Sequence, residues 1–462
     1  MLFNSIDFAI FLPVVFVLYW FVANKNLKLQ NVVIVVSSYV FYGWWDWRFL
    51  TLIIFSTLVD YSVGRKLVTT ENSIQRKVLL WTSILVNIGF LGFFKYYNFF
   101  LDNFVSAFRF FGTEIDVNSL NIILPVGISF YTFQTLSYTI DVYKRKLEPT
   151  KDVIAFSAFV SFFPQLVAGP IERATHLLPQ ILQKRSMKKE ELIKGGHLMV
   201  YGLFLKVFVA DSLAPQVNEI FANYKTLPGG SLVLGAIFFS FQIYGDFAGY
   251  SKIARGTAKL FGFELMVNFD RPYFSRNIAE FWRKWHISLN TWFRDYLYIP
   301  LGGSRSGKFK ALRNIFIIFL VSGFWHGANW TFIVWGLIHS TLFAPLFLLN
   351  VNRKYLEPVK LNEFSLTTLK NVLSIFLTFF VTTLAWIFFR SETLFDAMGY
   401  IANLSFEFTN YLGFLWICII AVSVDLIIYN DKVKTYLSTI LLGLVIAAGI
   451  ANTSSEFIYF QF

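Results

Sequence analysis

Residues 319–340 read FLVSGFWHGANWTFIVWGLIHS, and this stretch decides the fold class. It holds no Asp, Glu, Lys or Arg, and apolar residues continue on both sides of it, so that two long apolar runs lie near 314–328 and 329–349. A bilayer core needs about 20 mostly apolar residues per helix, with tolerance for shorter or tilted spans. The stretch therefore predicts two successive membrane-spanning helices.

Composition extends this prediction to the whole chain. Of its 462 residues 56% are hydrophobic and only 15% are charged, whereas soluble domains carry about 25% charged residues. Ten further apolar runs lie near 8–23, 31–46, 48–63, 79–94, 121–141, 198–213, 231–250, 371–389, 411–429 and 435–451. We predict an all-α polytopic membrane protein of about eleven or twelve transmembrane helices plus re-entrant and amphipathic helices, in a single membrane domain over residues 1–462.

The loops predict the orientation of these spans. Basic loops lie at 25–29, 64–77, 144–146, 251–313, 352–354 and 431–434, whereas 214–230 holds one basic residue, Lys225, and 391–410 holds no Lys or Arg. Because Lys and Arg collect on the cytoplasmic side, alternating the spans from an outside N-terminus places every basic loop inside. The net charge of +12 is explained in this way and does not require a nucleic-acid partner.

One apolar run breaks this alternation. Residues 153–170 read VIAFSAFVSFFPQLVAGP and precede a segment, 172–194, that holds six Lys or Arg. A full crossing at 153–170 would leave this basic segment outside. Pro164, Gly169 and Pro170 instead favour a broken or re-entrant segment, which a membrane protein tolerates only where protein or a water-filled cavity surrounds it.

Three of the five histidines are candidates for chemistry. His326 follows about a dozen apolar residues, which places it about 18 Å along a membrane helix, where an ionisable residue is a functional candidate. Gly323 and Gly327 flank it and would let a substrate come close. A neutral imidazole is a general base at pH 7. The alternative for His326 is a hydrogen-bonded core histidine; we expect His339 to be structural and His286 to be intermediate.

Other chemistry finds little support in the sequence. Cys418 is the one cysteine, so an intrachain disulfide and a thiolate metal cluster are excluded, and the histidines lack the spacing of metal ligands. The segment GGSRSGK at 302–308 matches the start of a phosphate-binding loop, but Phe309 stands where Ser or Thr must bind Mg²⁺. An NTPase is therefore disfavoured, although a basic glycine-rich loop can still contact phosphates.

Basic and aromatic residues are interleaved at 277–301, which read NIAEFWRKWHISLNTWFRDYLYIPL. The spacing predicts one amphipathic helix, with Arg283, Lys284 and Arg294 off its apolar stripe. The stripe consists of Phe281, Trp285, Ser288, Leu289, Trp292, Tyr296 and Ile299. One interpretation is an interfacial helix that lies on an anionic leaflet. His286, set among tryptophans, favours a functional role instead.

Long motifs resemble one family. LPVGISFYTFQTLSYTIDVY (124–143), FPQLVAGPI (163–171), the segment 244–305 that includes WRKWHISL, FWHGANWTFIVWGLIH (324–339) and the ending FIYFQF (457–462) are similar to membrane-bound O-acyltransferases (MBOAT). The similarity is strongest to the bacterial alginate O-acetyltransferase type, a branch that also includes peptidoglycan O-acetyltransferases. It extends along nearly the whole chain.

This resemblance implies a helix bundle around a central tunnel in the bacterial cytoplasmic (inner) membrane. It implies that His326, in the WHG motif, is catalytic and that His286, in WHISL, lines the site. The implied reaction is acetyl transfer from acetyl-CoA, with no permanently bound cofactor and no metal. Arg283, Lys284, Arg294 and Arg305 are candidate contacts of the CoA phosphates, by charge and membrane side alone.

The acceptor implied by the resemblance is a hydroxyl of an extracytoplasmic partner of the SGNH esterase-like type, which then O-acetylates a cell-surface or extracellular polysaccharide such as alginate. Peptidoglycan O-acetylation and D-alanyl transfer to teichoic acid are alternatives within the family. A secondary transporter that uses an intramembrane histidine as a proton relay is a different class. A scaffold of a polysaccharide-export complex, with structural histidines, is another.

Overall fold

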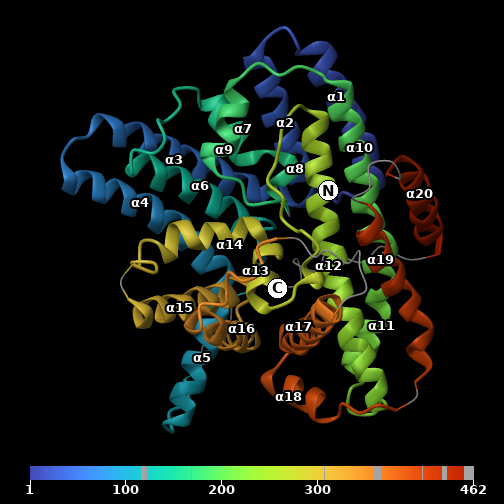
Figure 1. Cartoon of the computed structure of the whole chain (residues 1–462). Coiled ribbons are helices and arrows are strands. Elements are labelled where there is room, and N and C mark those ends of the chain that lie inside the picture. Colours follow the sequence, from blue (N-terminus) through green and yellow to red (C-terminus); the bar gives the residue numbers. More distant parts are fainter. Residues whose placement is uncertain are drawn as a thin grey trace. The chain divides into compact units, whose positions relative to one another are not determined.

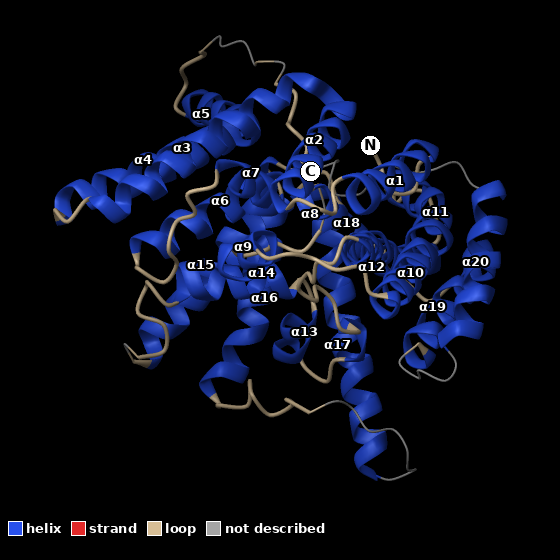
Figure 2. Cartoon of the chain, turned by 90° about the horizontal axis from the view of Figure 1, so that it is seen from above, coloured by secondary structure: helices blue, strands red, loops and turns tan. Residues whose placement is uncertain are grey.

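A computed structural model describes residues 1–115, 120, 122–167, 169–305, 307–357, 366–407, 409–428 and 434–451. Among these residues the structure has helices and loops and no strand (Figure 2). The chain groups into two compact units, one made of residues 1–196 and 254–266, the other of residues 197–253 and 267–462. Figure 1 labels their helices. The motif at 457–462 lies outside the described residues.

The first unit contains nine complete helices in its described part. They are α1 (Ile6–Val17), α2 (Leu27–Asp46), α3 (Leu50–Thr69), α4 (Ser73–Leu91), α5 (Tyr97–Phe110), α6 (Ile128–Tyr143), α7 (Val153–Ser161), α8 (Phe163–Leu166) and α9 (Ala174–Leu182). Helices α3, α4 and α6 pack together, and α7 packs on α2, α3 and α9. A π-helical turn, Gly92–Tyr96, joins α4 to α5, so that helical structure runs from residue 73 to residue 110.

Two long helices begin or end in the first unit and continue in the second. They are α10 (Lys189–Leu203), which a π-helical segment at Phe204–Ala210 joins to α11 (Asp211–Ala222), and α12 (Gly229–Leu260). The second unit also contains α13 (Ile278–Lys284), α14 (Ile287–Phe293), α15 (Lys308–His326), α16 (Trp330–Leu348), α17 (Leu366–Arg390), α18 (Leu394–Ala402), α19 (Leu415–Ile427) and α20 (Lys434–Ala451). Helix α16 packs against α13, α15 and α17.

Six helical segments of the described chain are long and apolar enough to cross a membrane. They are Ser73–Phe110, Lys189–Ala222, Gly229–Leu260, Trp330–Leu348, Leu366–Arg390 and Asn410–Ile427. Shorter apolar helices lie at Ile6–Val22, Val153–Leu166 and Tyr436–Gly449. Many apolar side chains on these helices are exposed, as for Phe376 at 63% and Trp81 at 57%, which suits contact with lipid rather than water. The prediction of an all-α polytopic membrane protein is confirmed.

Buried polar side chains join helices in the first unit. The carboxylate of Asp60 on α3 accepts hydrogen bonds from Ser83, from Asn87 (2.9 Å, both on α4) and from Thr139 (3.2 Å) on α6. All four side chains are 1% exposed or less. In an apolar environment such hydrogen bonds hold neighbouring helices in one register.

The segment 153–170 is broken, as the sequence predicts. Helix α7 ends at Ser161, and the short helix α8 begins at Phe163 after Phe162 leaves the helical region (ψ 102°). Pro164 occupies the first turn of α8, where its missing N–H costs no hydrogen bond. The break follows from this proline, because a ring at position 164 would clash with a helix that continued from residue 160.

The prediction of one amphipathic helix over 277–301 is wrong. Trp285 is extended and His286 is left-handed (φ 45°), so that α13 ends before them and α14 begins after them. Phe281, Trp285 and Trp292 on the expected stripe are at most 7% exposed within the protein. An interfacial helix would show such side chains to lipid, so the structure does not fit that interpretation.

The glycines beside His326 serve helix packing. A Cβ on Gly323 would lie 2.2 Å from the carbonyl oxygen of Phe332 on α16, and one on Gly327 would overlap the Phe332 ring at 2.0 Å. A Cβ on Gly336 would in turn lie 2.3 Å from the carbonyl oxygen of Phe319 on α15. The close approach of α15 and α16 therefore depends on these glycines, rather than leaving room for a substrate as the sequence suggested.

We predict that Gly336→Val destabilises the protein by about 1–3 kcal/mol, the usual cost of overpacking. The added side chain clashes with backbone, which cannot rotate away. Thermal unfolding in detergent, followed by tryptophan fluorescence, measures the loss. Gly89→Val on α4 is the control, since no atom lies within 4 Å of its added Cβ. Equal unfolding temperatures for the two variants would contradict the packing role of Gly336.

Candidate active site

His326 is the last residue of α15. Gly327 then leaves the helix in an extended conformation, and Asn329 caps α16 by accepting a hydrogen bond from the N–H of Thr331 at 3.0 Å. The chain therefore reverses within three residues, and His326 sits at the tip of the α15–α16 hairpin. It lies 18 residues from Lys308, about 27 Å along the helix.

Aromatic rings surround His326, whose exposed fraction is 3%. Its ring centroid lies 4.9 Å from that of Trp325, 5.2 Å from Trp335 and 5.3 Å from Phe389. These rings come from α15, α16 and α17, so three helices fix the position of one imidazole. Such a wall also keeps bulk water away from the ring, which strengthens electrostatic interactions at the site.

His286 lies beside His326, with 6.4 Å between the two ring centroids. The ring of His286 also contacts Phe247 edge-on at 4.6 Å, and the residue is 1% exposed. Its left-handed backbone is a conformation that costs a non-glycine residue free energy and that often marks a functional site. The structure thus brings together the two histidines that the family resemblance singled out, across 40 residues of chain.

Asn268 sets the tautomer of His286. Its Oδ1 atom accepts hydrogen bonds from the N–H of Ser288 (3.2 Å) and from the Ser288 hydroxyl (2.8 Å). The backbone donor fixes which end of the amide is oxygen, so Nδ1 of His286, 3.1 Å from that oxygen, carries the proton and donates. Nε2 of His286 then holds a lone pair and has no hydrogen-bond partner among the described residues.

Burial keeps the His286 ring neutral. The histidine lies in the break between α13 and α14, outside the candidate membrane spans, and desolvation lowers its pKa well below the ordinary value. A base works best when its pKa lies near the operating pH. His286 therefore suits holding a donor group of a substrate at Nε2 better than removing a proton.

His339 lies in the middle of α16 and is fully buried. Its Nδ1 accepts a hydrogen bond from the indole N–H of Trp282 at 3.3 Å, and its ring lies 4.9 Å from Trp335. This hydrogen bond from Trp282 joins α13 to α16, so His339 has a structural role.

The sequence did not identify Asn268 as a site residue, because no local pattern around it signals that its amide faces residues 286 and 288.

Two of the four basic candidates line a pocket of about 240 Å³. Arg283 donates hydrogen bonds to the carbonyl oxygens of Asn352 (2.7 Å) and Tyr355 (2.8 Å), and Lys284 forms an ion pair with Glu280 at 2.9 Å. Arg294 and Arg305 do not line this pocket. The first pairs with Asp295 at 2.7 Å, and the second is exposed. The structure brings Arg283 and Lys284 together and leaves the other two apart from them.

The pocket and His326 lie toward opposite ends of α16. Asn329, at the start of this helix, donates to the carbonyl oxygen of Glu392 at 2.8 Å, whereas the chain after its end, at Asn352 and Tyr355, is bound by Arg283. Helix α16 has 19 residues, about 28 Å. Among the described residues no group of three His, Cys, Asp or Glu side chains could hold a metal ion.

Comparisons with known proteins show the family of this chain. Residues 149–349 match the model of the MBOAT, membrane-bound O-acyltransferase family. The chain is 40% identical to "Probable alginate O-acetylase AlgI" of Pseudomonas syringae over 85% of this chain and 73% of that protein. It is 31% identical to "Peptidoglycan O-acetyltransferase" of Helicobacter pylori over 100% of this chain and 98% of that one.

The chain is more distantly similar to "Teichoic acid D-alanyltransferase" of Bacillus subtilis. The two are 29% identical over 51% of this chain and 62% of that protein. The matched segment 149–349 contains His286, His326, His339 and Asn268. Taken with the all-helical architecture and the paired histidines, these similarities show that the chain is a multi-pass membrane acyltransferase and belongs to the membrane-bound O-acyltransferase family.

Proposed function

We propose that this protein is an O-acetyltransferase of the bacterial cytoplasmic membrane that takes acetyl groups from acetyl-CoA and passes them to an acceptor hydroxyl on the other side. The acetyl groups serve O-acetylation of a cell-surface or extracellular polysaccharide of the alginate type, through an extracytoplasmic partner of the SGNH type. The observation that carries the proposal is the buried pair of imidazoles, 6.4 Å apart, one of which has its tautomer fixed. The names of the relatives with 40% and 31% identity support O-acetyl transfer.

The proposed chemistry needs one base and one positioned neutral ring. His326 accepts the proton of the acceptor hydroxyl as the oxygen attacks the thioester carbonyl carbon. The new C–O bond forms, the C–S bond breaks, and the CoA thiolate leaves and takes the proton that His326 accepted, which restores the neutral imidazole. His286 accepts a hydrogen bond at Nε2 from a donor group of the bound substrates and holds them in line.

Labelled acetyl-CoA tests this proposal on the purified protein, with the candidate partner or a soluble polysaccharide as acceptor. Transfer of label from CoA to the acceptor supports it. One matched reaction uses labelled D-alanyl carrier protein as the donor and teichoic acid as the acceptor. A second keeps labelled acetyl-CoA as the donor and offers peptidoglycan as the acceptor. Label transfer with the D-alanyl donor and none with acetyl-CoA would overturn the choice of donor.

We place the phosphates of acetyl-CoA near the pocket that Arg283 and Lys284 line. Lys284→Gln is expected to raise the KM for acetyl-CoA about tenfold, the effect of losing one charge-assisted contact, with kcat little changed. Lys284 is the better probe of the two, because Arg283 also holds the chain at 352–355. Glu280 stays paired in the variant, since Arg276 binds both of its oxygens, at 3.0 and 2.9 Å.

Lys310→Gln is the control for this measurement. It removes the same charge from an exposed position of the same unit that does not line the pocket. An unchanged KM in Lys284→Gln, or an equal rise in both variants, would mean that the phosphates bind elsewhere.

A further inference from the structure

A second pocket, of about 580 Å³, lies in the first unit at the start of α10 and the end of α12. Its lining consists of Trp20 and of residues from the segments 180–194 and 259–264. Because α10 and α12 both belong to candidate membrane spans, and their ends at residues 189 and 260 lie together here, the pocket lies at the level where these two candidate spans end. The indole of Trp20, a residue type enriched at that level, forms part of its wall.

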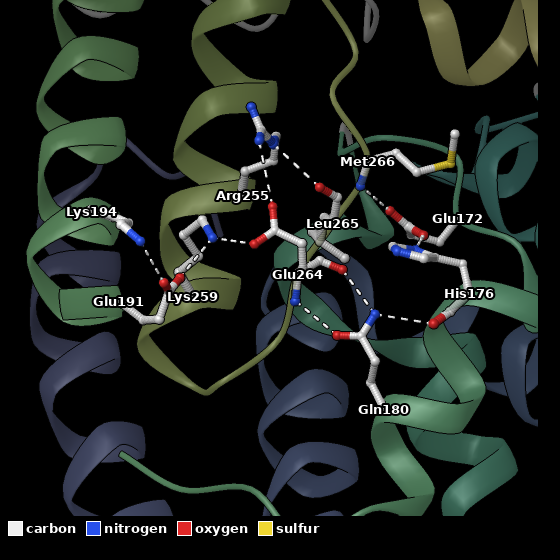
Figure 3. Close-up of polar contacts among 10 residues, drawn as sticks. All are labelled: Glu172, His176, Gln180, Glu191, Lys194, Arg255, Lys259, Glu264, Leu265 and Met266. Carbon is white, nitrogen blue, oxygen red and sulfur yellow. Dashed lines mark hydrogen bonds and ion pairs between the residues drawn. The ribbon is translucent and has the colours of Figure 1, made fainter. Parts of the chain in front are cut away.

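Positive charge exceeds negative charge in this pocket. Its cationic lining residues are Lys184, Arg185, Lys188, Lys194 and Lys259. Its carboxylates are Glu191 and Glu264, and each of them is already bound by two cations. Glu191 contacts Lys194 at 2.9 Å and Lys259 at 2.8 Å, and Glu264 contacts Lys259 and Arg255 (Figure 3).

The other three cations have no carboxylate partner in the described part of the chain. Lys184 and Lys188 are exposed, whereas Arg185 is 5% exposed. The guanidinium of Arg185 donates only to uncharged oxygens, among them Asn31 Oδ1 at 2.7 Å and the carbonyl of Ile181 at 2.9 Å, and its Nε has no hydrogen-bond partner. A desolvated charge that meets no opposite charge is costly, and its burial lowers the pKa of Arg185.

We propose that this pocket binds a phosphate group, with Lys184 and Lys188 at its mouth and the buried charge of Arg185 in its wall. A phosphate offers the negative charge that the lining lacks, and lysines bind it as point charges. The group can come from the headgroup of an anionic phospholipid or from a soluble phosphate. The proposal does not depend on the acetyl-transfer function, because no residue of the histidine site takes part.

Lipid retention by the full-length protein tests the first source. The protein is purified from mixed phosphatidylglycerol and phosphatidylcholine vesicles into a neutral detergent, and bound lipids are quantified by mass spectrometry. We expect the wild type to retain phosphatidylglycerol preferentially. Lys184→Gln/Lys188→Gln should lower this retention roughly thirtyfold, since each of the two lysines near an anionic surface contributes about 1 kcal/mol.

Lys25→Gln/Lys28→Gln is the matched control, because these two lysines are exposed, lie in the same unit and do not line the pocket. The second source is tested on lipid-stripped protein with inorganic phosphate and with CoA, by the shift of the unfolding temperature. A shift in the wild type that the pocket variant loses supports the phosphate site with a soluble ligand. Equal lipid retention and equal shifts in the wild type and both double variants would overturn the proposal.

Discussion

His326→Ala is expected to lower acetyl transfer by at least about 100-fold, the low end for losing a positioned general base. The variant should stay folded, because the imidazole contacts aromatic rings that also contact one another, such as Trp335 and Phe389 at 5.2 Å. Turnover of acetyl-CoA with the acceptor present is measured on purified protein, together with its unfolding temperature.

His339→Ala is the matched control for this experiment. It also removes a fully buried imidazole from the same helical hairpin, but one that meets the indole of Trp282 rather than the paired site. We expect a much smaller loss of turnover there, and an intermediate loss for His286→Ala. Near-normal turnover in His326→Ala, or a loss of stability that matches the loss of activity, would make His326 a packing residue.

Asn268→Leu is expected to lower kcat at least tenfold and to leave the KM for acetyl-CoA nearly unchanged. Leucine has a similar size but accepts no hydrogen bond, so that Nδ1 of His286 is no longer held as the donor and the tautomer is free to change. Asn268 acts through His286 and is a positioning residue. Steady-state kinetics at several pH values measure both constants.

Asn268→Asp separates this role from simple packing. A carboxylate still accepts from Ser288 and from His286, so activity should return at high pH. Its negative charge favours the imidazolium form and raises the pKa of His286, so the acidic limb of the kcat profile should move to higher pH. If the Leu and Asp variants lose the same activity at every pH, Asn268 has only a packing role.

Much of the architecture could be predicted because it depends on local composition. The charge-free stretch at 319–340 predicts the α15–α16 hairpin, although α15 begins at Lys308, before the apolar run, and α16 but not α15 is among the candidate membrane spans. The break in 153–170 follows from Pro164 alone. The family motifs named His286 and His326, and the structure places their rings 6.4 Å apart.

The errors arise where distant parts of the chain decide the conformation. The apolar spacing of 277–301 is helical, yet His286 is left-handed, and the contacts that accompany this strain come from Asn268 and Phe247, 18 and 39 residues earlier in the chain. Arg283 looked like a free phosphate ligand, but its partners lie about 70 residues later, at Asn352 and Tyr355. No local pattern contains such pairs.

Sealed proteoliposomes give the most direct test of acetyl transfer across the membrane. Labelled acetyl-CoA is added outside to vesicles whose lumen holds the acceptor, and label on the acceptor is counted for wild type and for His326→Ala. Our account predicts that wild-type vesicles label the enclosed acceptor and that His326→Ala vesicles fall at least about 100-fold below them. Equal labelling by the two proteins would contradict this account. So would labelling that needs the vesicles to be opened with detergent, in both orientations of the protein.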